Sequence, residues 1–211
     1  DAVLTPEEKD QGVGLIDIGG GTTDLAVFSN GTIKYSWELA LGGNNLTNDL
    51  SVGLRTPLQE AEELKYLYGG ALSSIKENQM IDVPTVGERK NRKVSQKSLV
   101  GILEARMEEI FQLVDKNIAT AGVRNRIKAG LVLTGGTALL PNVVELAEQV
   151  FDMPVRIGYP SNVGGLLEQI NTPRTTTAVG LVLFGSHSKK FAAQEQGGIF
   201  SRFKRWLRGM I

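Results

Sequence analysis

A turn rich in glycine and threonine lies near the start of the chain, in the stretch DIGGGTTD from Asp17 to Asp24. Its glycines let the backbone take positive φ angles and approach a ligand closely, and successive backbone N–H groups in such a turn can bind an anion. Asp17 ends an apolar run, where its carboxylate is placed to hold a hydrated Mg²⁺ beside phosphates. The pattern predicts a phosphate-binding turn made of Gly19, Gly20, Gly21 and the hydroxyl donors Thr22 and Thr23.

This turn differs from two better-known phosphate-binding motifs. No Gly-Lys-Ser/Thr follows the glycines, so the turn is not a P-loop. We expect a strand rather than a helix after it, which excludes the dinucleotide fingerprint. An ordinary glycine-rich hairpin is the alternative, and the complete pattern of strand, DIGGGTTDLAVF and strand makes it less favourable.

A second glycine pair occurs much later, in LVLTGGTALLPNV from Leu131 to Val143. This run has the pattern of a buried strand, a Gly-Gly turn and a helix, and ligands of open α/β sheets bind beyond the carboxyl ends of the strands. Gly135 and Gly136 carry no side chains, so a planar base or a ribose can lie against them. A simple strand-to-helix turn is the alternative for this motif alone; the two motifs together favour a nucleotide site.

The final stretch, GIFSRFKRWLRGMI, combines apolar and basic residues at helical spacing. One face of such a helix is apolar: Ile199, Phe200, Phe203, Trp206, Leu207, Met210 and Ile211. The other face carries Arg202, Lys204, Arg205 and Arg208. The helix is too short to span a bilayer, and its two faces predict binding in the interface of an anionic membrane, where each cation contributes roughly 1 kcal/mol.

Two alternatives remain open for this segment. The helix could dock on the core of its own chain, or a partner could capture it as calmodulin captures amphipathic helices. Residues 186–198 are polar and have the composition of a linker that lets the helix reach away from the body. This linker favours membrane binding over docking.

Composition excludes several classes of protein. The 211 residues include 23 basic and 23 acidic side chains and are 41% hydrophobic, which excludes a disordered chain and a strongly charged nucleic-acid carrier, so we expect no nucleic-acid partner. The absence of cysteine excludes a disulfide scaffold, a thiolate metal site and a cysteine nucleophile. With His187 as the single histidine, neither a Ser-His-Asp triad nor a multi-histidine zinc site is expected.

Charge and the N-terminal sequence bear on location. Residues 186–211 hold six of the basic side chains and one of the acidic ones, so a basic end follows an acidic body. The N-terminus has no signal-peptide pattern, and no run of about 18 apolar residues occurs. We expect a cytoplasmic chain and, because it lacks an initiator Met, a piece of a longer protein.

Short apolar runs predict the strands that position these motifs. The first three are joined by hairpins, one through the glycine-rich turn and one through Ser29-Asn30-Gly31. The predicted strands cover residues 13–18, 25–28, 32–41, 129–133 and 155–157, with strand-like positions at 81–83 and Val86.

Apolar residues at helical spacing predict the helices. One contains Leu46, Leu50 and Leu54. Another begins at Pro57 and ends at Gly69-Gly70, and one of its faces consists of Ala61, Leu64, Leu67 and Tyr68. Further helices are predicted from near Pro141 to Phe151 and, apolar and buried, over 176–184. A long helix begins at Ser98, and one apolar stripe of it comprises Leu99, Ile102, Leu103, Met107, Ile110, Phe111 and Val114.

These motifs resemble the second half of the actin/Hsp70/hexokinase ATPase superfamily. Within it, four segments resemble the FtsA family of bacterial cell-division proteins: ALGGNNLTNDL (40–50), TPLQEAEELKYLYGGAL (56–72), SLVGILEARMEEIF (98–111) and TTAVGLVLFG (176–185). The resemblance runs from about Gly12 to the C-terminus and identifies the C-terminal half of such a protein. The family's first half, with its first phosphate loop, is absent.

The resemblance implies an α/β fold, namely half of an actin-like, ribonuclease H-like ATPase. A lower subdomain of residues 1–50 and 105–185 would carry an inserted upper α/β subdomain of residues 51–104. A linker of residues 186–198 and an amphipathic, membrane-targeting helix of residues 199–211 would follow.

The resemblance also implies roles for individual residues. Asp17 corresponds to the Mg²⁺-water ligand, and Gly19, Gly20, Gly21, Thr22 and Thr23 correspond to the phosphate turn. The adenosine turn corresponds to Gly135, Gly136 and Thr137. Glu62 and Lys65 would close over ribose and base, although their EAEELK context is also typical of a solvated helix face. The implied cofactors are ATP and Mg²⁺, bound weakly without the first half and with hydrolysis close to nil.

A basic strip lies within residues 89–97: Arg89, Lys90, Arg92, Lys93 and Lys97. A solvated loop is the ordinary interpretation of such a strip. The resemblance implies another use, because Arg92 and Arg106 stand where the family binds the C-terminal peptide of the tubulin-like protein FtsZ. Arginine suits that task, since its planar guanidinium can bond a carboxylate bidentately.

The function that follows from the resemblance is mechanical. An actin-like subunit would self-associate into filaments, tether the FtsZ ring to the cytoplasmic face of the inner membrane as a peripheral protein, and recruit other divisome proteins. Two alternatives stay open: a PilM-like protein of pilus or secretion-system assembly, and a fragment of a superfamily sugar kinase.

Overall fold

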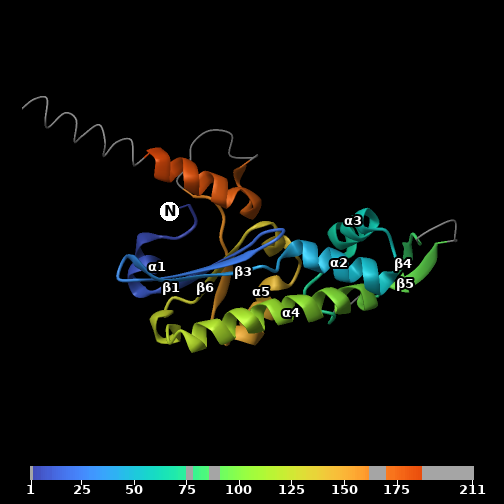
Figure 1. The fold of residues 1–211 in the computed structure, drawn as a ribbon, viewed down its shortest axis with the longest axis horizontal. Helices are drawn as coiled ribbons and strands as arrows, with labels where there is room; N and C mark the ends of the chain where they lie inside the picture. The colour runs from blue at the N-terminus through green and yellow to red at the C-terminus, as the bar shows by residue number, and fades with distance from the viewer. Residues whose placement is uncertain (1, 75–77, 86–90, 162–169, 187–211) are drawn as a thin grey trace, which may run out of the picture.

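A five-stranded mixed sheet forms the centre of the computed structural model, which describes residues 2–74, 78–85, 91–161 and 170–186. Its strands lie in the order β3-β2-β1-β6-β7 (Figure 1). They are β1 (Val13–Ile18), β2 (Thr23–Ser29), β3 (Thr32–Leu39), β6 (Leu131–Thr134) and β7 (Val155–Ile157). The first three pair antiparallel through hairpins, as predicted, whereas β6 and β7 add in parallel to β1. The α/β class is confirmed.

The parallel pairing of β1 with β6 decides where the two glycine motifs lie. Asp17 of β1 is in register with Thr134 of β6. Because the carboxyl ends of parallel strands meet at one edge of a sheet, the turn after Ile18 and the turn after Thr134 lie side by side. Motifs far apart in sequence therefore become neighbours.

The long helix α4 (Gln96–Thr120) covers one face of the sheet together with α5 (Val143–Phe151). The whole predicted stripe of α4 is buried except for Ile102, which is half-buried. Phe111 of α4 meets Phe151 of α5 edge to face, with ring centroids 5.4 Å apart. The helix begins two residues earlier than predicted, because the Ser95 side chain accepts a hydrogen bond from the Ser98 amide and caps it.

Beyond one end of the large sheet lie α2 (Gly43–Leu54), α3 (Leu58–Tyr68) and a small antiparallel sheet, as Figure 1 shows. The small sheet consists of β4 (Met80–Val83) and β5 (Arg92–Ser95), with Ile81 opposite Val94. The predicted apolar face of α3 is buried only in part, because Leu67 is 65% exposed. Ala61 and Leu64 already fill the contact with the core, and Leu67 projects past it.

The other face of the large sheet is covered by a helix of residues 176–186 and by residues 2–4 (Figure 1, orange and dark blue). The helix was predicted, but its burial was wrong: Leu181 is 68% and Val182 72% exposed. One side of the helix packs on the sheet through Val179, next to Val13 and Val132. An apolar sequence alone does not distinguish burial on one side from burial on all sides.

A short helix, α1 (Pro6–Gln11), was not predicted. Its signal is present in the sequence as a capping box. The Thr5 side chain accepts from the Glu8 amide, and the Glu8 carboxylate accepts from the Thr5 amide. Proline at the first helical position completes the pattern.

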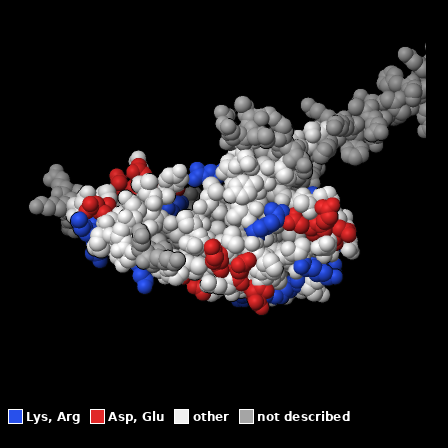
Figure 2. All heavy atoms as spheres, turned by 180° about the vertical axis from the view of Figure 1, so that it is seen from behind, with Lys and Arg blue, Asp and Glu red and all other residues white. Residues whose placement is uncertain are grey.

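Several predictions fall outside the described residues: the strand-like Val86, the cations Arg89 and Lys90, residues 187–198 of the linker, and the whole 199–211 segment. Ser186, the first residue of that predicted linker, still belongs to the 176–186 helix. Among the described residues, no helix has the length and apolar character needed to cross a bilayer. Seen from behind, acidic and basic side chains are interspersed (Figure 2).

Candidate nucleotide-binding site

The glycine-rich turn between β1 and β2 packs against the first residues of α2. The amides of Gly43 and Asn44 donate to the carbonyl oxygens of Gly19 and Gly20, at 2.9 and 2.7 Å. This approach requires glycine at the helix N-cap, because a Cβ on Gly42 would lie 2.8 Å from the Gly19 oxygen. The amides at the N-terminus of α2 therefore hold the turn by its carbonyl oxygens.

The second glycine turn presses against the first. Gly135 has φ +87°, and a Cβ built on it would lie 2.4 Å from both Asp17 Oδ1 and the Ile18 carbonyl oxygen. The hydroxyl of Thr137 donates to the Gly19 carbonyl oxygen at 3.1 Å. The residues predicted for phosphate and for adenosine are thus in direct contact.

Glu62 and Lys65 of α3 reach the same place from the other side. Lys65 Nζ donates to the Gly43 carbonyl oxygen at 3.0 Å and to Thr47 Oγ1 at 2.7 Å, and it forms an ion pair with Glu62 at 2.7 Å. The Thr47 hydroxyl also bonds the Glu62 carboxylate. Burial raises the pKa of Glu62, but Lys65 and Thr47 stabilise the charged form more strongly, so the net pKa is lowered.

These groups surround one cavity of about 770 Å³, within the range of small-ligand sites. Six predicted site residues line it: Gly19, Gly20, Glu62, Lys65, Gly136 and Thr137. The other five nucleotide and metal candidates, Asp17, Gly21, Thr22, Thr23 and Gly135, belong to the adjoining turns and are not part of its lining. Thr23 is buried and its hydroxyl donates to the Leu41 carbonyl oxygen at 2.9 Å, so it holds the turn in shape.

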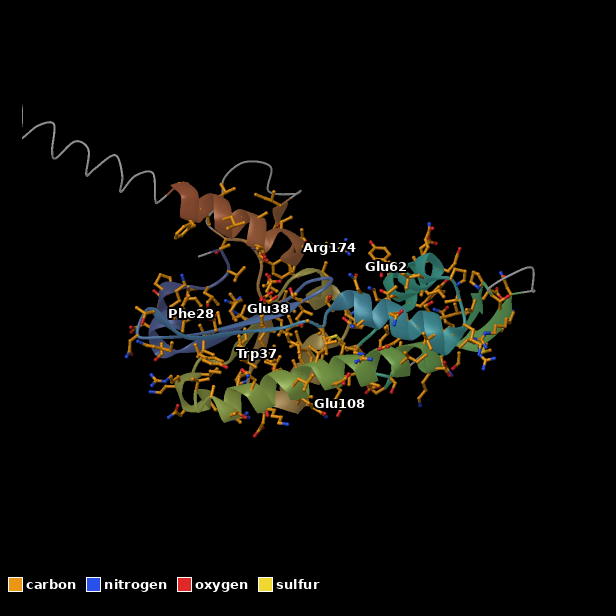
Figure 3. The ribbon with its side chains drawn as sticks, in the orientation of Figure 1. Phe28, Trp37, Glu38, Glu62, Glu108 and Arg174 are labelled. Atoms are coloured by element: carbon orange, nitrogen blue, oxygen red, sulfur yellow. The ribbon has the colours of Figure 1, made fainter. Side chains whose placement is uncertain are left out.

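Sequence reasoning missed Tyr66 and Arg174, which also line the cavity. The Arg174 guanidinium lies over the Tyr66 ring, 6.0 Å from its centroid. Figure 3 shows Arg174 and Glu62 on the same side of the molecule, and Arg174 helps to lower the pKa of Glu62. Tyr66 follows Lys65 on α3, a position that could have been suspected, whereas no local signal marks Arg174.

Asp17 is the carboxylate predicted to hold a hydrated cation, and it is half-buried. Burial raises the pKa of its carboxyl, the Thr177 hydroxyl opposes that shift, and the charge of Asp24 reinforces it, so the net pKa is raised. No group of three or more His, Cys, Asp or Glu side chains able to hold a metal occurs in the part of the chain that the structure describes. Mg²⁺ fits this donor set, because it keeps several waters and uses one or two carboxylates beside phosphates.

The comparisons with known proteins decide the family. The family model described as cell division protein FtsA matches residues 14–180. This chain belongs to the FtsA family. It is 46% identical to cell division protein FtsA of Neisseria meningitidis, over 98% of this chain and 53% of the relative. It is 40% identical to cell division protein FtsA of Pseudomonas aeruginosa, over 99% of this chain and 53% of the relative. The chain spans about half the length of the curated relatives it matches. The prediction that it is the C-terminal half of an FtsA-family protein is confirmed.

Solved structures show the same fold. MreB5 of Spiroplasma citri bound to ADP superposes with a TM-score of 0.67 at 25% identity, over 87% of this chain and 56% of that protein. A PilM–PilN type IV pilus biogenesis complex matches with a TM-score of 0.65 at 19% identity, over 85% and 47%. The pilus protein shares the actin-like fold alone, and the family match selects FtsA over the pilus-assembly and sugar-kinase alternatives.

The two arginines expected to bind a peptide in the FtsA family lie outside the cavity. Arg106 of α4 bonds both carboxylate oxygens of Asp49 on α2, at 2.5 and 3.1 Å, and also contacts Glu109. Arg92 of β5 donates to the Leu54 carbonyl oxygen at the end of α2. Both cations therefore lie beside α2, and each has a partner within the chain.

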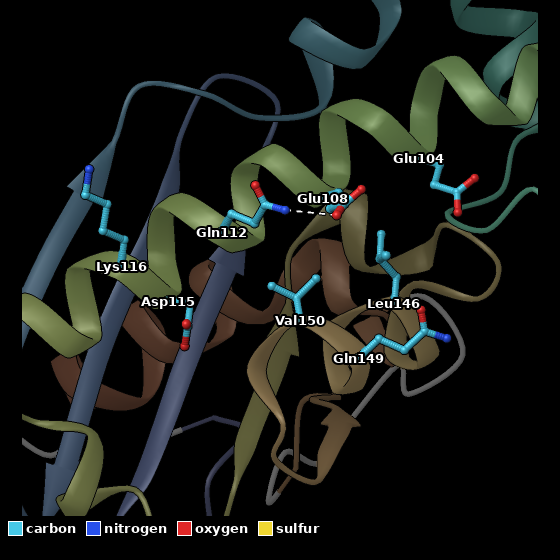
Figure 4. Close-up of a pocket in the computed structure, with 8 residues that line it drawn as sticks. All are labelled: Glu104, Glu108, Gln112, Asp115, Lys116, Leu146, Gln149 and Val150. Carbon is cyan, nitrogen blue, oxygen red and sulfur yellow. Dashed lines mark hydrogen bonds between the residues drawn. The ribbon is translucent and has the colours of Figure 1, made fainter.

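A second cavity, of about 420 Å³, lies between α4 and α5. Figure 4 shows Glu104, Glu108 and Asp115 along α4, facing Leu146 and Val150 of α5. Gln112 donates to Glu108, one turn away on the same helix, at 2.9 Å. The lining of this second cavity contains none of the predicted site residues, which gather instead at the larger cavity.

Proposed function

We propose that this chain forms one wall of the adenine-nucleotide cleft of an actin-like cell-division protein. One observation carries the proposal: the parallel pairing of β1 with β6 brings the two glycine turns together, opposite Glu62 and Lys65. The phosphates would lie at Gly19–Gly21 and the N-terminus of α2. Ribose and base would lie between Gly136 and the side chains of α3.

The fold neighbours support this ligand. MreB5 of Spiroplasma citri has been crystallised with ADP and with AMPPNP, at 25% identity to this chain. Bound beside Asp17, Mg²⁺ would neutralise phosphate charge, and Asp17 would orient its waters. Lys65 would contribute a positive charge near the ribose and phosphates. Half a cleft forms fewer contacts than a whole one, so we expect weak binding and little hydrolysis by this chain alone.

The mechanical part of the proposal extends to partners. Actin-like neighbours include a MamK double helical filament, which supports the idea that the whole protein self-associates. Arg92 and Arg106 would take the acidic part of the FtsZ C-terminal peptide. The 199–211 segment would hold the assembly on the cytoplasmic side of the inner membrane, where other divisome proteins would join it.

The test of the nucleotide site is a titration of the 211-residue chain with fluorescent ADP and MgCl₂. We expect weak, saturable binding that Lys65→Ala reduces about tenfold, since hydrogen bonds with charged groups contribute roughly 1.5–3 kcal/mol. Lys116→Ala is the matched control, because Lys116 lines the other cavity. No saturable binding at millimolar ADP, or equal losses in both variants, would refute the proposed site.

A further inference from the structure

Thr177 connects the 176–186 helix to the carboxylate of Asp17, near the end of β1. Its Oγ1 donates to Asp17 Oδ2 at 2.6 Å, across 160 positions of sequence. Thr177 belongs to neither glycine turn; it is the second residue of the helix. The hydrogen bond therefore adds a third element to the junction of the two turns.

The other oxygen of Asp17 faces the second glycine turn. Only the absence of a side chain at Gly135 leaves it room, since a Cβ there would lie 2.4 Å from Oδ1. The plane of the carboxylate is therefore set by a hydroxyl at one oxygen and by backbone at the other. A carboxylate has about four lone-pair sites, so Oδ2 can keep the Thr177 bond while the group also accepts bonds from metal-bound water.

The start of the 176–186 helix is held at the edge of the large sheet. The hydroxyl of buried Thr176 lies 2.9 Å from that of Thr134 on β6 and donates to the Pro173 carbonyl oxygen at 2.9 Å. Further along, Leu181 and Val182 are largely exposed. The first turn of the 176–186 helix is thus held by the edge of the sheet, and the outer side of the helix projects away from the sheet. A change at Asp17 therefore acts on the end of the helix that is held in place.

We propose that Thr177 is a positioning residue for the cation of a bound magnesium–nucleotide complex, and that its hydroxyl links this ligand to the 176–186 helix. The inference rests on the proposed function, because it requires ADP and Mg²⁺ to bind beside Asp17. Thr177 fixes the rotamer of Asp17 so that the free lone pairs point to the waters of the ion. The bound ion in turn orders Asp17, which holds the first turn of the helix more firmly.

The experiment compares Thr177→Val, which keeps the shape but removes the donor, with Thr177→Ser, which keeps the donor. Thr120→Val is the control, because it removes a hydroxyl from the far end of α4, where Thr120 bonds the Lys116 carbonyl oxygen. ADP affinity of the 211-residue chain is measured with MgCl₂ and with EDTA. Amide hydrogen exchange of residues 176–186 is measured in the same solutions.

We expect Mg²⁺ to tighten ADP binding and to slow exchange in the helix of the parent chain, the Ser variant and the control. Thr177→Val should bind ADP about fivefold more weakly than the parent chain in MgCl₂ and equally well in EDTA. Mg²⁺ should no longer slow amide exchange in the 176–186 helix of this variant. If Thr177→Val has a lower melting temperature than the parent chain, Thr177→Ala replaces it in the same measurements.

The outcomes separate the two proposals. If the parent chain binds no ADP, the proposed function and this inference both fail. If it binds with a Mg²⁺ dependence that Thr177→Val leaves unchanged, the inference alone fails. An affinity loss of the same size with MgCl₂ and with EDTA marks a purely structural role and also overturns it.

Discussion

The hydroxyl of Thr137 donates a hydrogen bond to the carbonyl oxygen of Gly19 at 3.1 Å, across 118 positions of the chain. This bond joins the turn proposed for phosphate to the turn proposed for adenosine. The same Gly19 oxygen also accepts from the Gly43 amide at 2.9 Å, so one carbonyl group links the first glycine turn to both α2 and the second turn.

Replacement of Thr137 by valine should loosen this contact between the two turns. We expect about a three- to tenfold loss in ADP affinity, corresponding to one hydrogen bond of ordinary strength, and a small change in melting temperature. Fluorescent ADP titration measures the first and circular dichroism the second. Thr137→Ser should retain binding, and equal affinities of the Val and Ser variants would contradict the prediction.

Gly135→Ala should destabilise the fold. Its φ of +87° and the 2.4 Å approach of a Cβ to Asp17 Oδ1 both oppose any side chain, and such strain costs about 1–3 kcal/mol. Urea denaturation measures the loss. The matched control is Gly101→Ala in α4, where a Cβ would meet nothing within 4 Å. This control substitution should stabilise the helix by about 0.5–1 kcal/mol. The prediction is wrong if the two variants shift stability in the same direction.

Charge reversal at Arg106 should abolish binding of the FtsZ C-terminal peptide, if this arginine anchors it as we propose. Arg92→Glu should act in the same direction, whereas Arg126→Glu, in the 3-10 helix of Arg124–Arg126 that follows α4, should not. Because Asp49 and Glu109 both bind the Arg106 guanidinium, Asp49→Asn should weaken its attachment to α2 and raise peptide affinity. Fluorescence anisotropy with a labelled peptide measures all four. Unchanged affinity in both Arg92→Glu and Arg106→Glu refutes the assignment.

Acid should weaken the attachment of α1 to the sheet. Two hydrogen bonds from Arg156 of β7, each 2.7 Å, lower the pKa of Glu8 below its ordinary value of 4.5, and this effect outweighs burial. The folded protein thus releases the proton more readily than the unfolded chain, so this stabilisation is present above pH 4.5 and is lost as the pH falls through the folded pKa.

Because Arg156 is 42% exposed, the contribution of the pair is about 1 kcal/mol at most. Urea melts of the parent chain and Glu8→Gln from pH 6 to pH 3 measure it. The stability difference between the two should shrink toward pH 3. A constant difference over that range would count against the pair.

Membrane binding should depend on the 199–211 segment. We expect the 211-residue chain to float with vesicles that contain anionic lipid, and a chain ending at residue 198 to remain at the bottom of the gradient. Trp206→Asp should reduce flotation as well, because it places a charge on the apolar face. A truncated chain that floats as well as the intact one removes the proposal.

The parts of this fold that were predictable are those whose signals are local. DIGGGTTD indicated a hairpin because glycines and threonines follow an apolar run, and the stripe from Leu99 to Val114 indicated α4 because its period is helical. The capping box at Thr5 and Glu8 was also readable, although it was missed. The choice of glycine turns as a nucleotide site needed both the local pattern and the family resemblance.

The remainder depends on contacts between distant segments. Arg174 lies over Tyr66, and Thr177 bonds Asp17, although the members of each pair are far apart in the sequence. The exposure of Leu181 follows from how much of the helix the sheet can cover. Such facts are properties of packing, and no spacing within a single segment encodes them.

The helix α4 starts directly from the last residue of β5 and extends under the large sheet to Thr120. Its 25 residues form a continuous helix of about 37 Å. The small sheet is therefore joined without an intervening loop to the same helix whose buried stripe packs in the core beneath the large sheet.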